Sequence, residues 1–256
     1  MANPYFQCKQ FIVHQQHTSM KVCTDACLFG AWAAQQISTN NAKTILDIGT
    51  GTGLLSLMLA QVTEKSKTNI TAVEIESQAA AEASSNFTLS PWKERLHLVN
   101  DSIQNYTATF THVKHTDPPF FDVIITNPPF YEGDLKSPDA NKNKASHSTE
   151  LAWSTLIENV ATLLMDNGSF MVLVPTLRAY TMQKLAEAQQ LNLVEEVLVY
   201  NDIKHLPFRS FLHFQKNKQG LHKELIVIRN KIVIKNTDNS YSTAFTDLLK
   251  DYYLHL

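Results

Sequence analysis

The chain has few cysteines, no long apolar run and no excess of basic residues, and each absence narrows its class. Three cysteines among 256 residues do not form the even set that a disulfide framework needs. No apolar run approaches the roughly 18 residues of a membrane span. With a net charge of −2 the chain is not a protein that coats nucleic acid with a whole basic face, so any RNA site must be a local patch.

Signals for export and for metal binding are also missing. The first ten residues lack a basic n-region followed by an apolar stretch, so we expect no secretory signal and a cytoplasmic protein. Cys23 and Cys27 have no second cysteine or histidine pair to complete a zinc site. His112, His115 and Asp117 fall in the polar stretch 101–118, which we interpret as a solvated loop. We therefore expect no metal.

The most informative stretch that is present runs from Thr44 to Gly53. Its apolar first half, residues 45–48, is typical of a buried parallel strand. Gly49, Gly51 and Gly53 then allow a tight turn and a close approach of the backbone to a ligand. Residues 54–62 are apolar at helical spacing. A strand, a glycine turn and a helix predict a nucleotide-type pocket at the carboxyl end of the strand.

The pattern of this turn, Asp47-x-Gly-x-Gly-x-Gly53, resembles motif I of class I S-adenosylmethionine-dependent methyltransferases. S-adenosylmethionine carries an ammonium and a sulfonium and no pyrophosphate, so an acid beside the turn suits it. A generic glycine turn is the alternative for a motif this short. The resemblance implies S-adenosylmethionine as cofactor and S-adenosylhomocysteine as product.

Two further strands end in acidic residues that suit the same ligand. Glu74 closes strand 70–74, about 20 residues beyond the turn, where a carboxylate can accept hydrogen bonds from a ribose diol. Asp101 follows strand 96–99 and can contact an adenine amino group. We add the neighbours of these positions to the predicted cofactor site: Thr50, Ile75 and Ser102.

The strand at 121–126 runs into Asn127-Pro128-Pro129-Phe130, which resembles motif IV of methyltransferases that act on planar nitrogens. An exocyclic amine is a poor nucleophile because its lone pair is conjugated. The Asn127 side-chain oxygen and the Pro128 carbonyl can each accept one N–H, and the prolines fix φ. Phe130 can stack on a flat substrate. We predict that these four residues are catalytic, and that Asn127 also borders the cofactor.

Alternating strands and helices predict a three-layer α/β/α sandwich of the Rossmann-like methyltransferase type, with a mostly parallel sheet. The expected helices are 54–62, 77–89, 150–165 and 177–190, with a long loop at 132–148. The late strands 193–200, 209–215 and 223–229 have short connections, so we expect them to pair antiparallel. We find no repeat or linker and expect one domain, 1–256, with an N-terminal cap at about 1–40.

The two ends of the chain narrow the family. Residues 6–11, 20–25 and 30–32, and the C-terminal stretch 241–254, resemble a bacterial family that methylates N6 of adenine 37 in a valine tRNA. The resemblance spans nearly the whole chain and implies a tRNA partner, with no membrane and no obligate protein partner. Cys23, where glycine is expected, and Cys27 depart from the family pattern.

The resemblance also suggests residues around the pocket. Lys21, Thr24 and Asp25 are predicted to cap the cofactor cleft, although Lys21 as a surface lysine and Thr24 as a helix N-cap stay open alternatives. Candidate phosphate contacts are the basic side chains Lys136, Lys142, Lys144, Arg209 and Lys216, each of which can equally be a solvated charge.

Several other functions share these motifs. A glutamine-amide methyltransferase of a translation factor uses the same Asn-Pro-Pro motif but usually has a helical N-terminal domain, for which 46 residues before Asp47 leave no room. A DNA or rRNA adenine-N6 methyltransferase is another alternative, without a recognisable target-recognition domain here. A non-catalytic binding module would not need an amine-polarising turn.

Overall fold

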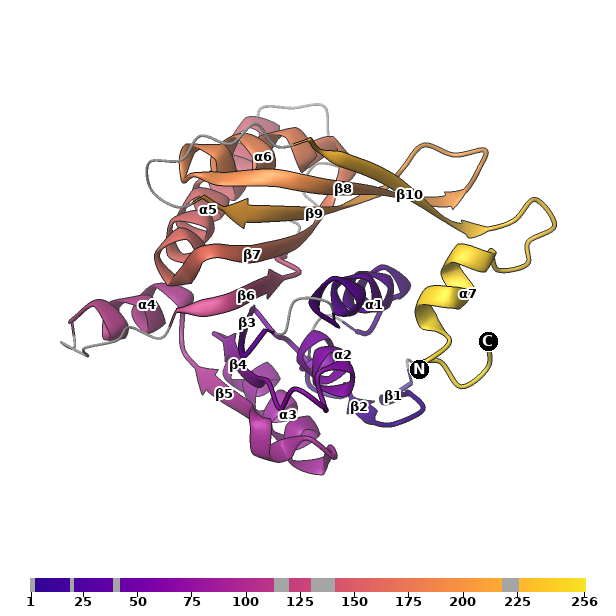
Figure 1. The fold of residues 1–256 in the computed structure, drawn as a ribbon, viewed down its shortest axis with the longest axis horizontal. Coiled ribbons are helices and arrows are strands. Elements are labelled where there is room, and N and C mark those ends of the chain that lie inside the picture. The colour runs from indigo at the N-terminus through magenta and orange to yellow at the C-terminus, as the bar shows by residue number, and fades with distance from the viewer. Residues whose placement is uncertain (1–2, 19–20, 39–41, 113–119, 130–140, 218–225) are drawn as a thin grey trace.

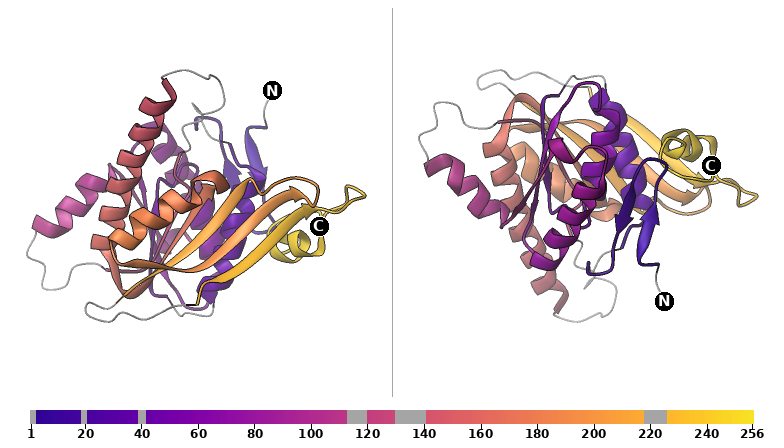
Figure 2. Two further views of the ribbon diagram at one scale, coloured as in Figure 1. Left: turned by 90° about the horizontal axis from the view of Figure 1, so that it is seen from above. Right: turned by 90° about the horizontal axis from the view of Figure 1, so that it is seen from below.

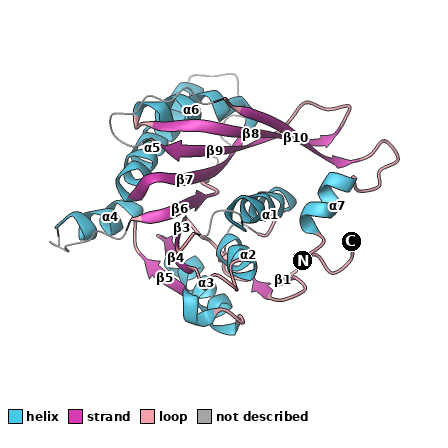
Figure 3. Cartoon of the chain, viewed as in Figure 1, coloured by secondary structure: helices cyan, strands magenta, loops and turns pink. Residues whose placement is uncertain are grey.

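A computed structural model describes residues 3–18, 21–38, 42–112, 120–129, 141–217 and 226–256 (Figure 1). For residues 110–112 and 141–151 only the backbone is described. A large mixed β-sheet runs through the middle of the molecule and helices pack on both of its faces, as Figure 3 shows.

The main sheet has eight strands among the described residues, in the spatial order β10-β8-β9-β7-β6-β3-β4-β5. The first five of them along the chain, β3 to β7, are mutually parallel. Their bounds, followed by those of the last three strands, are β3 Thr44–Ile48, β4 Asn69–Glu74, β5 Leu96–Asn100, β6 Phe121–Thr126, β7 Leu164–Pro175, β8 Leu191–Asp202, β9 Arg209–Lys216 and β10 Ile228–Lys235. The mostly parallel sandwich is therefore confirmed.

The late strands follow the prediction only in part. β9 is antiparallel to both β7 and β8, as expected. β10 begins later than predicted and pairs with β8 in parallel, so the antiparallel expectation is wrong for this strand. The reason is topological: β10 lies beside β8 and not beside β9. A strand that turns back from the reversed β9 necessarily runs in the same direction as β8.

Two layers of helices cover the sheet. On one face lie α1 Thr24–Ser38, α2 Leu54–Val62 and α3 Ser77–Leu89, whose buried side chains join one apolar cluster with the strands. On the other face α4 Ile103–His112, α5 Asn141–Leu163 and α6 Ala179–Ala188 contribute to a second cluster. Both layers are visible in the two turned views of Figure 2.

Two stretches that the sequence predicts to be loops are partly helical in the structure. The stretch 101–118 contains α4, because Ser102 caps a turn in which Tyr106 and Thr107 are buried. The predicted loop 132–148 contains the first turns of α5, which begins at Asn141. No glycine or proline interrupts residues 141–163, so nothing local stops that helix from extending.

The two ends of the chain pack together outside the main sheet. β1 Tyr5–Gln7 and β2 Ile12–His14 form an antiparallel hairpin, and α7 Thr243–Leu249 follows β10. The backbone of Cys8 forms an isolated antiparallel β-bridge with that of Tyr253, and the backbone N–H of Lys9 donates to the carbonyl of Tyr252 (2.8 Å). The N-terminal hairpin also packs on α3, where it can position the segment that leads into α1.

Candidate active site

The predicted site residues converge at the carboxyl edge of four neighbouring parallel strands. In spatial order these strands are β6, β3, β4 and β5. Asn127 follows β6, the turn at Gly49 follows β3, Glu74 ends β4 and Asp101 follows β5. Register pairs Ile48 with both Thr126 and Val73, so these ends are level with one another. This edge is where open α/β sheets bind ligands.

The glycine turn has the backbone that its sequence requires. Gly49, Gly51 and Gly53 have φ values of +70°, +57° and +83°, a region that L side chains rarely adopt. A Cβ built on Gly49 or Gly51 would have no described atom within 4 Å, so the space beside these two residues is open. A Cβ on Gly53 would lie 2.5 Å from the ring of Phe87. The first two glycines therefore face a cavity and the third allows close packing of α3.

Asp47 stabilises this turn through hydrogen bonds. Its Oδ2 accepts hydrogen bonds from the hydroxyls of Thr50 (2.6 Å) and Ser56 (2.7 Å), and the side chain is completely buried. Burial raises the pKa of the carboxyl to about 6. Its Oδ1 has no hydrogen-bond partner among the described residues. Asp47 thus orders Thr50 and the start of α2, and its direct contact with a cofactor stays a prediction.

Glu74 is oriented by the same turn. The backbone N–H of Gly51 donates to its Oε2 (2.8 Å), and the N–H of Glu76 donates to its Oε1 (2.9 Å). A carboxylate offers about four acceptor positions, so two remain for a ligand diol. The next side chain, Ile75, is 71% exposed, which leaves an apolar surface beside the acid.

Asp101 and Ser102 form the start of α4. Oδ1 of Asp101 accepts from the backbone N–H of Ser102 (2.7 Å) and from the side-chain amide of Asn105 (2.9 Å). The Ser102 hydroxyl oxygen accepts from the N–H of Asn105 (3.1 Å), which makes it a helix cap. Both side chains are half-buried at the far end of the edge.

Asn127 lies in the wall of a small cavity of about 60 Å³. Its Oδ1 is buried and accepts no hydrogen bond from any described residue, which is costly unless a ligand supplies a donor. Pro128 is buried and Pro129 is exposed. The cavity is lined by residues of the α1 approach, the glycine turn and β6: Lys21, Val22, Cys23, Ala26, Gly49, Thr50, Gly51, Thr52, Leu54, Leu55 and Asn127.

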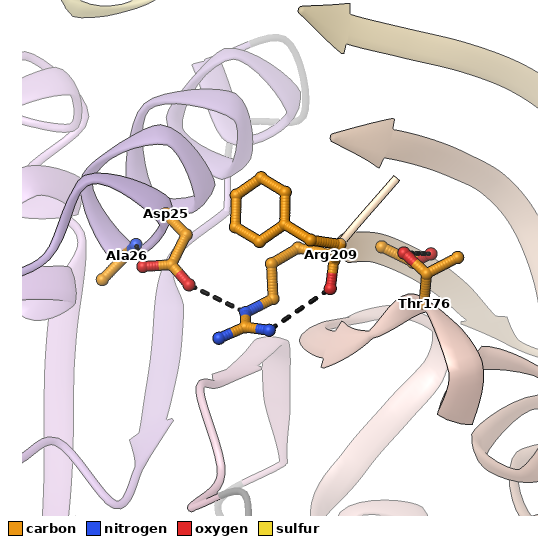
Figure 4. A network of polar contacts seen from close by, with 6 residues as sticks. Asp25, Ala26, Thr176 and Arg209 are labelled. Atoms are coloured by element: carbon orange, nitrogen blue, oxygen red, sulfur yellow. Dashed lines mark hydrogen bonds and ion pairs between the residues drawn. The ribbon is translucent and has the colours of Figure 1, made fainter. Parts of the chain in front are cut away.

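Of the three residues predicted to cap the cleft, only Lys21 is among those that line the cavity, and the role of the cap stays a prediction. The Lys21 ammonium donates to the backbone carbonyls of Gln15 and Thr18, so it anchors its own loop. Thr24 is exposed at the first residue of α1 and does not line the cavity. Asp25 pairs with Arg209 of β9, with 2.8 Å between Oδ2 and Nε, as Figure 4 shows.

That ion pair bears on the predicted phosphate contacts. The charge of Arg209 is balanced by Asp25, and that of Lys216 is directed at the carbonyls of Ala161 and Leu164. Phe130 and Lys136 lie outside the described residues, and so do the side chains of Lys142 and Lys144. Their roles stay predictions.

Two residues of α3 escaped the sequence analysis. The buried Glu82 carboxylate accepts the backbone N–H groups of Gln16, His17 and Thr18. Asn86 hydrogen-bonds both backbone groups of His14 and the carbonyl of Thr52, which is part of the glycine turn. The available signal was their spacing, because both share a helix face with the buried alanines of α3. They clamp the loop that precedes the cavity-lining residues.

Cys23, where the resemblance led us to expect glycine, borders the cavity. It is half-buried, and its surroundings raise the pKa of the thiol to about 12, first through burial and then through the charge of Asp25. The thiol therefore stays protonated at neutral pH. Cys27 lies one turn later in the core of α1.

The donor set and the space fit the predicted cofactor. Open space beside Gly49 and Gly51 and the two remaining acceptor positions of Glu74 suit a ligand that carries hydroxyl donors. In the part of the chain that the structure describes there is no group of three or more His, Cys, Asp or Glu that could hold a metal. The same residues include no helix long and apolar enough to cross a membrane.

Comparison with solved structures supports the fold. A protein of Agrobacterium tumefaciens described as a predicted O-methyltransferase matches with a TM-score of 0.64 at 14% identity, over 88% of this chain and 95% of its own. An O-methyltransferase from Bacillus cereus, solved in complex with SAH, matches with a TM-score of 0.53 at 13% identity, over 78% and 84%. Both share the methyltransferase architecture.

Comparison with sequences identifies the family. The methyltransferase small domain family matches residues 31–200. Two proteins named tRNA1(Val) (adenine(37)-N6)-methyltransferase, from Bacteroides thetaiotaomicron and Cytophaga hutchinsonii, are 37% and 38% identical to this chain, over 100% of both partners. The chain therefore belongs to the methyltransferase small domain family and, within it, to the bacterial group that carries this tRNA methyltransferase name.

Proposed function

We propose that this chain transfers a methyl group from S-adenosylmethionine to N6 of an adenine in tRNA, and that its target is adenine 37 of a valine tRNA. The names of full-length relatives support the substrate. A tRNA substrate also supports a cytoplasmic enzyme. The observation that carries the chemistry is the buried, unpartnered Asn127 oxygen at the cavity wall.

The residues at this wall provide what an aromatic amine needs. Asn127 Oδ1 accepts one N–H of the amine and the Pro128 carbonyl accepts the other, which draws the nitrogen toward a tetrahedral geometry and frees its lone pair. Bound S-adenosylmethionine supplies a methyl group that its sulfonium already activates. Alignment and polarisation then account for the catalysis, and no strong base is required before attack.

On the cofactor side, the proposed roles follow the contacts. Glu74 accepts the ribose hydroxyls, and its orientation by Gly51 N–H pre-organises it for this. The open backbone at Gly49 and Gly51 allows close approach of the ligand. Asp101 binds the adenine amino group from the far end of the edge, and Phe130 stacks on the acceptor base.

The substitution Asn127→Ala tests whether Asn127 acts on the base that accepts the methyl group or on the cofactor that donates it. Because Asn127 contacts the acceptor, Asn127→Ala should lower single-turnover methylation of saturating tRNA by about 10²–10³-fold, by analogy with the loss of one preorganised donor in an oxyanion hole. Cofactor affinity by calorimetry should stay close to that of the wild type. Asn69→Ala is the matched control, because Asn69 is an exposed residue at the amino end of β4, outside the cavity lining.

The substrate itself is identified by mass spectrometry of nucleosides from tRNA incubated with the enzyme and labelled methyl donor. N6-methyladenosine, mapped to position 37 of a valine tRNA, is the expected product. Labelled glutamine in a translation factor, with unmodified tRNA, would favour the amide methyltransferase alternative instead. Near-normal turnover in Asn127→Ala would refute the amine-polarising role.

A further inference from the structure

Large apolar side chains are exposed on two connections near the candidate active site. Leu177 is 95% exposed and Leu206 is 87% exposed, and Tyr180 and Ile203 are 69% and 65% exposed. The first connection follows β7 as the 3₁₀ turn η3 Thr176–Arg178 and leads into α6. The second joins β8 to β9 through residues 203–208. Exposure of several such side chains at one place marks an interaction surface.

The two connections form one surface. The backbone N–H of Thr176 donates to the carbonyl of Phe208 (3.3 Å), and the Ser210 hydroxyl donates to that of Thr176 (3.4 Å). Register places Pro175 opposite Arg209 at the base of both connections. We call the surface formed by Leu177, Arg178, Tyr180, Ile203, Lys204 and Leu206 the docking face.

The backbone of the docking face is anchored on both connections. Asp202 accepts from the backbone N–H of Lys204 (2.8 Å) and contacts the ring of His205 (2.7 Å). On α6 the Lys184 ammonium lies 5.5 Å from the centroid of the Tyr180 ring. A connection whose backbone is already held in place has less conformational entropy to lose when a partner binds to it.

The docking face lies at the same edge of the sheet as the acceptor position. β6 and β7 are parallel with Thr126 opposite Val172, so β7 continues past the level of Asn127 to Pro175 and then into the docking face. The Arg209–Asp25 ion pair joins the base of this face to α1, whose residue Ala26 lines the cavity (Figure 4). The docking face and the cavity therefore lie at the same edge of the sheet, and this ion pair links the elements that carry them.

We propose that the docking face binds the RNA segment that flanks the acceptor adenine, an inference that rests on the proposed function. The exposed, cationic Lys204 stands among the apolar side chains, which suits bases stacked beside phosphates. Since the chain carries a net charge of −2, RNA contact requires such a local patch. Unstacked bases of a tRNA loop present flat faces for Tyr180, Leu177 and Leu206.

The test combines two exposed substitutions in the full chain, Leu177→Ser with Leu206→Ser. The matched control is Ile226→Ser, because Ile226 is 92% exposed but precedes β10 at the opposite edge of the sheet. The affinity for tRNA is measured by fluorescence anisotropy, the cofactor affinity by calorimetry, and KM and kcat with tRNA. We expect the double variant to bind tRNA roughly 10–100-fold more weakly, with a raised KM. Its kcat at saturating tRNA and its cofactor affinity should match those of the wild type.

A charge variant tests the same face independently. Lys204→Ala should lower the slope of log Kd for tRNA against log salt by about 1, as expected for one phosphate contact. Lys93→Ala, an exposed residue beside β5 at the amino edge, should leave the slope unchanged.

The outcomes are distinguishable. A double variant with wild-type tRNA affinity would overturn the docking face, and so would a finding by sedimentation that the substitutions only abolish self-association of the chain. A wild-type enzyme that methylates no adenine in tRNA would refute the proposed function. The affinity measurement needs no turnover, so it tests the docking face in either case.

Discussion

Asn86 offers a sensitive test of how the fold supports the site. Its side chain is 1% exposed and accepts from the backbone N–H of His14 while donating to the carbonyls of His14 and Thr52, each at 2.9 Å. One amide thus joins the end of β2 to the glycine turn. Asn86→Ala removes all three hydrogen bonds at once.

The expected loss of stability follows from how deeply each hydrogen bond is buried. The bond to Thr52 is fully buried, so its loss leaves an unsatisfied carbonyl at about 1–3 kcal/mol, and the two part-buried bonds to His14 are worth about 0.5–1.5 kcal/mol each. The free energy of unfolding should fall by about 2–6 kcal/mol. For a chain of this length that lowers Tm by on the order of 10 °C. Because Thr52 lines the cavity, cofactor affinity should fall as well.

Thermal unfolding of three variants shows whether the loss of stability comes from the hydrogen bonds of Asn86 or from any change on α3. Asn86→Asp keeps an acceptor for the His14 N–H but turns an oxygen toward two carbonyls, so it should be at least as destabilised as Asn86→Ala at neutral pH. Ser85→Ala, at an exposed position of the same helix, should leave Tm within a few degrees of the wild type. A fall of less than about 2 °C in Asn86→Ala would refute the clamp as a source of stability.

The remaining predictions concern the cofactor side. Glu74→Ala should weaken S-adenosylmethionine binding by about 1.5–3 kcal/mol through a lost charge-assisted hydrogen bond, and unchanged affinity by calorimetry would count against the assignment. Gly53→Ala combines a φ of +83° with a Cβ 2.5 Å from Phe87, so it should cost about 1–3 kcal/mol in urea unfolding, and an unshifted midpoint would contradict this. Asp47 has a folded-state pKa of about 6, raised above its ordinary 3.8 by burial, so its contribution to stability is present below about pH 4 and is lost as pH rises through 6. Asp47→Asn does not titrate, so its stability relative to the wild type should improve by about 3 kcal/mol between pH 4 and 7, and a difference independent of pH would exclude this burial cost.

The sequence predicted the part of the fold that rests on local signals. Apolar runs before a glycine turn, before an acid and before Asn-Pro-Pro identified β3, β4 and β6, and the predicted helix 77–89 agrees with α3 to the residue. The predicted site residues Gly49, Glu74, Asp101 and Asn127 do meet at one edge, because parallel strands share a carboxyl side. Their individual roles stay predictions that the experiments above address.

What escaped prediction depends on contacts between distant segments. The choice of β8 rather than β9 as the partner of β10 is decided by the whole sheet. The partner of Arg209 is equally non-local, because Asp25 lies 184 residues away in the sequence and a charged side chain in a short window shows nothing of the carboxylate that it will meet. Glu82 was missed for the same reason, since its three backbone donors lie more than 60 residues away.

The start of α1 is where the two sides of the site are joined. Cys23 and Ala26 line the cavity, while Asp25 between them points the other way and pairs with Arg209 at the base of the docking face. The loop before these residues is held by Glu82 and Asn86, and Asn86 also holds the glycine turn. One short segment therefore contacts the predicted cofactor turn, the acceptor wall and the strand that carries the docking face. A change that loosens this segment should affect cofactor binding and tRNA binding together, whereas Leu177→Ser with Leu206→Ser should affect tRNA binding alone.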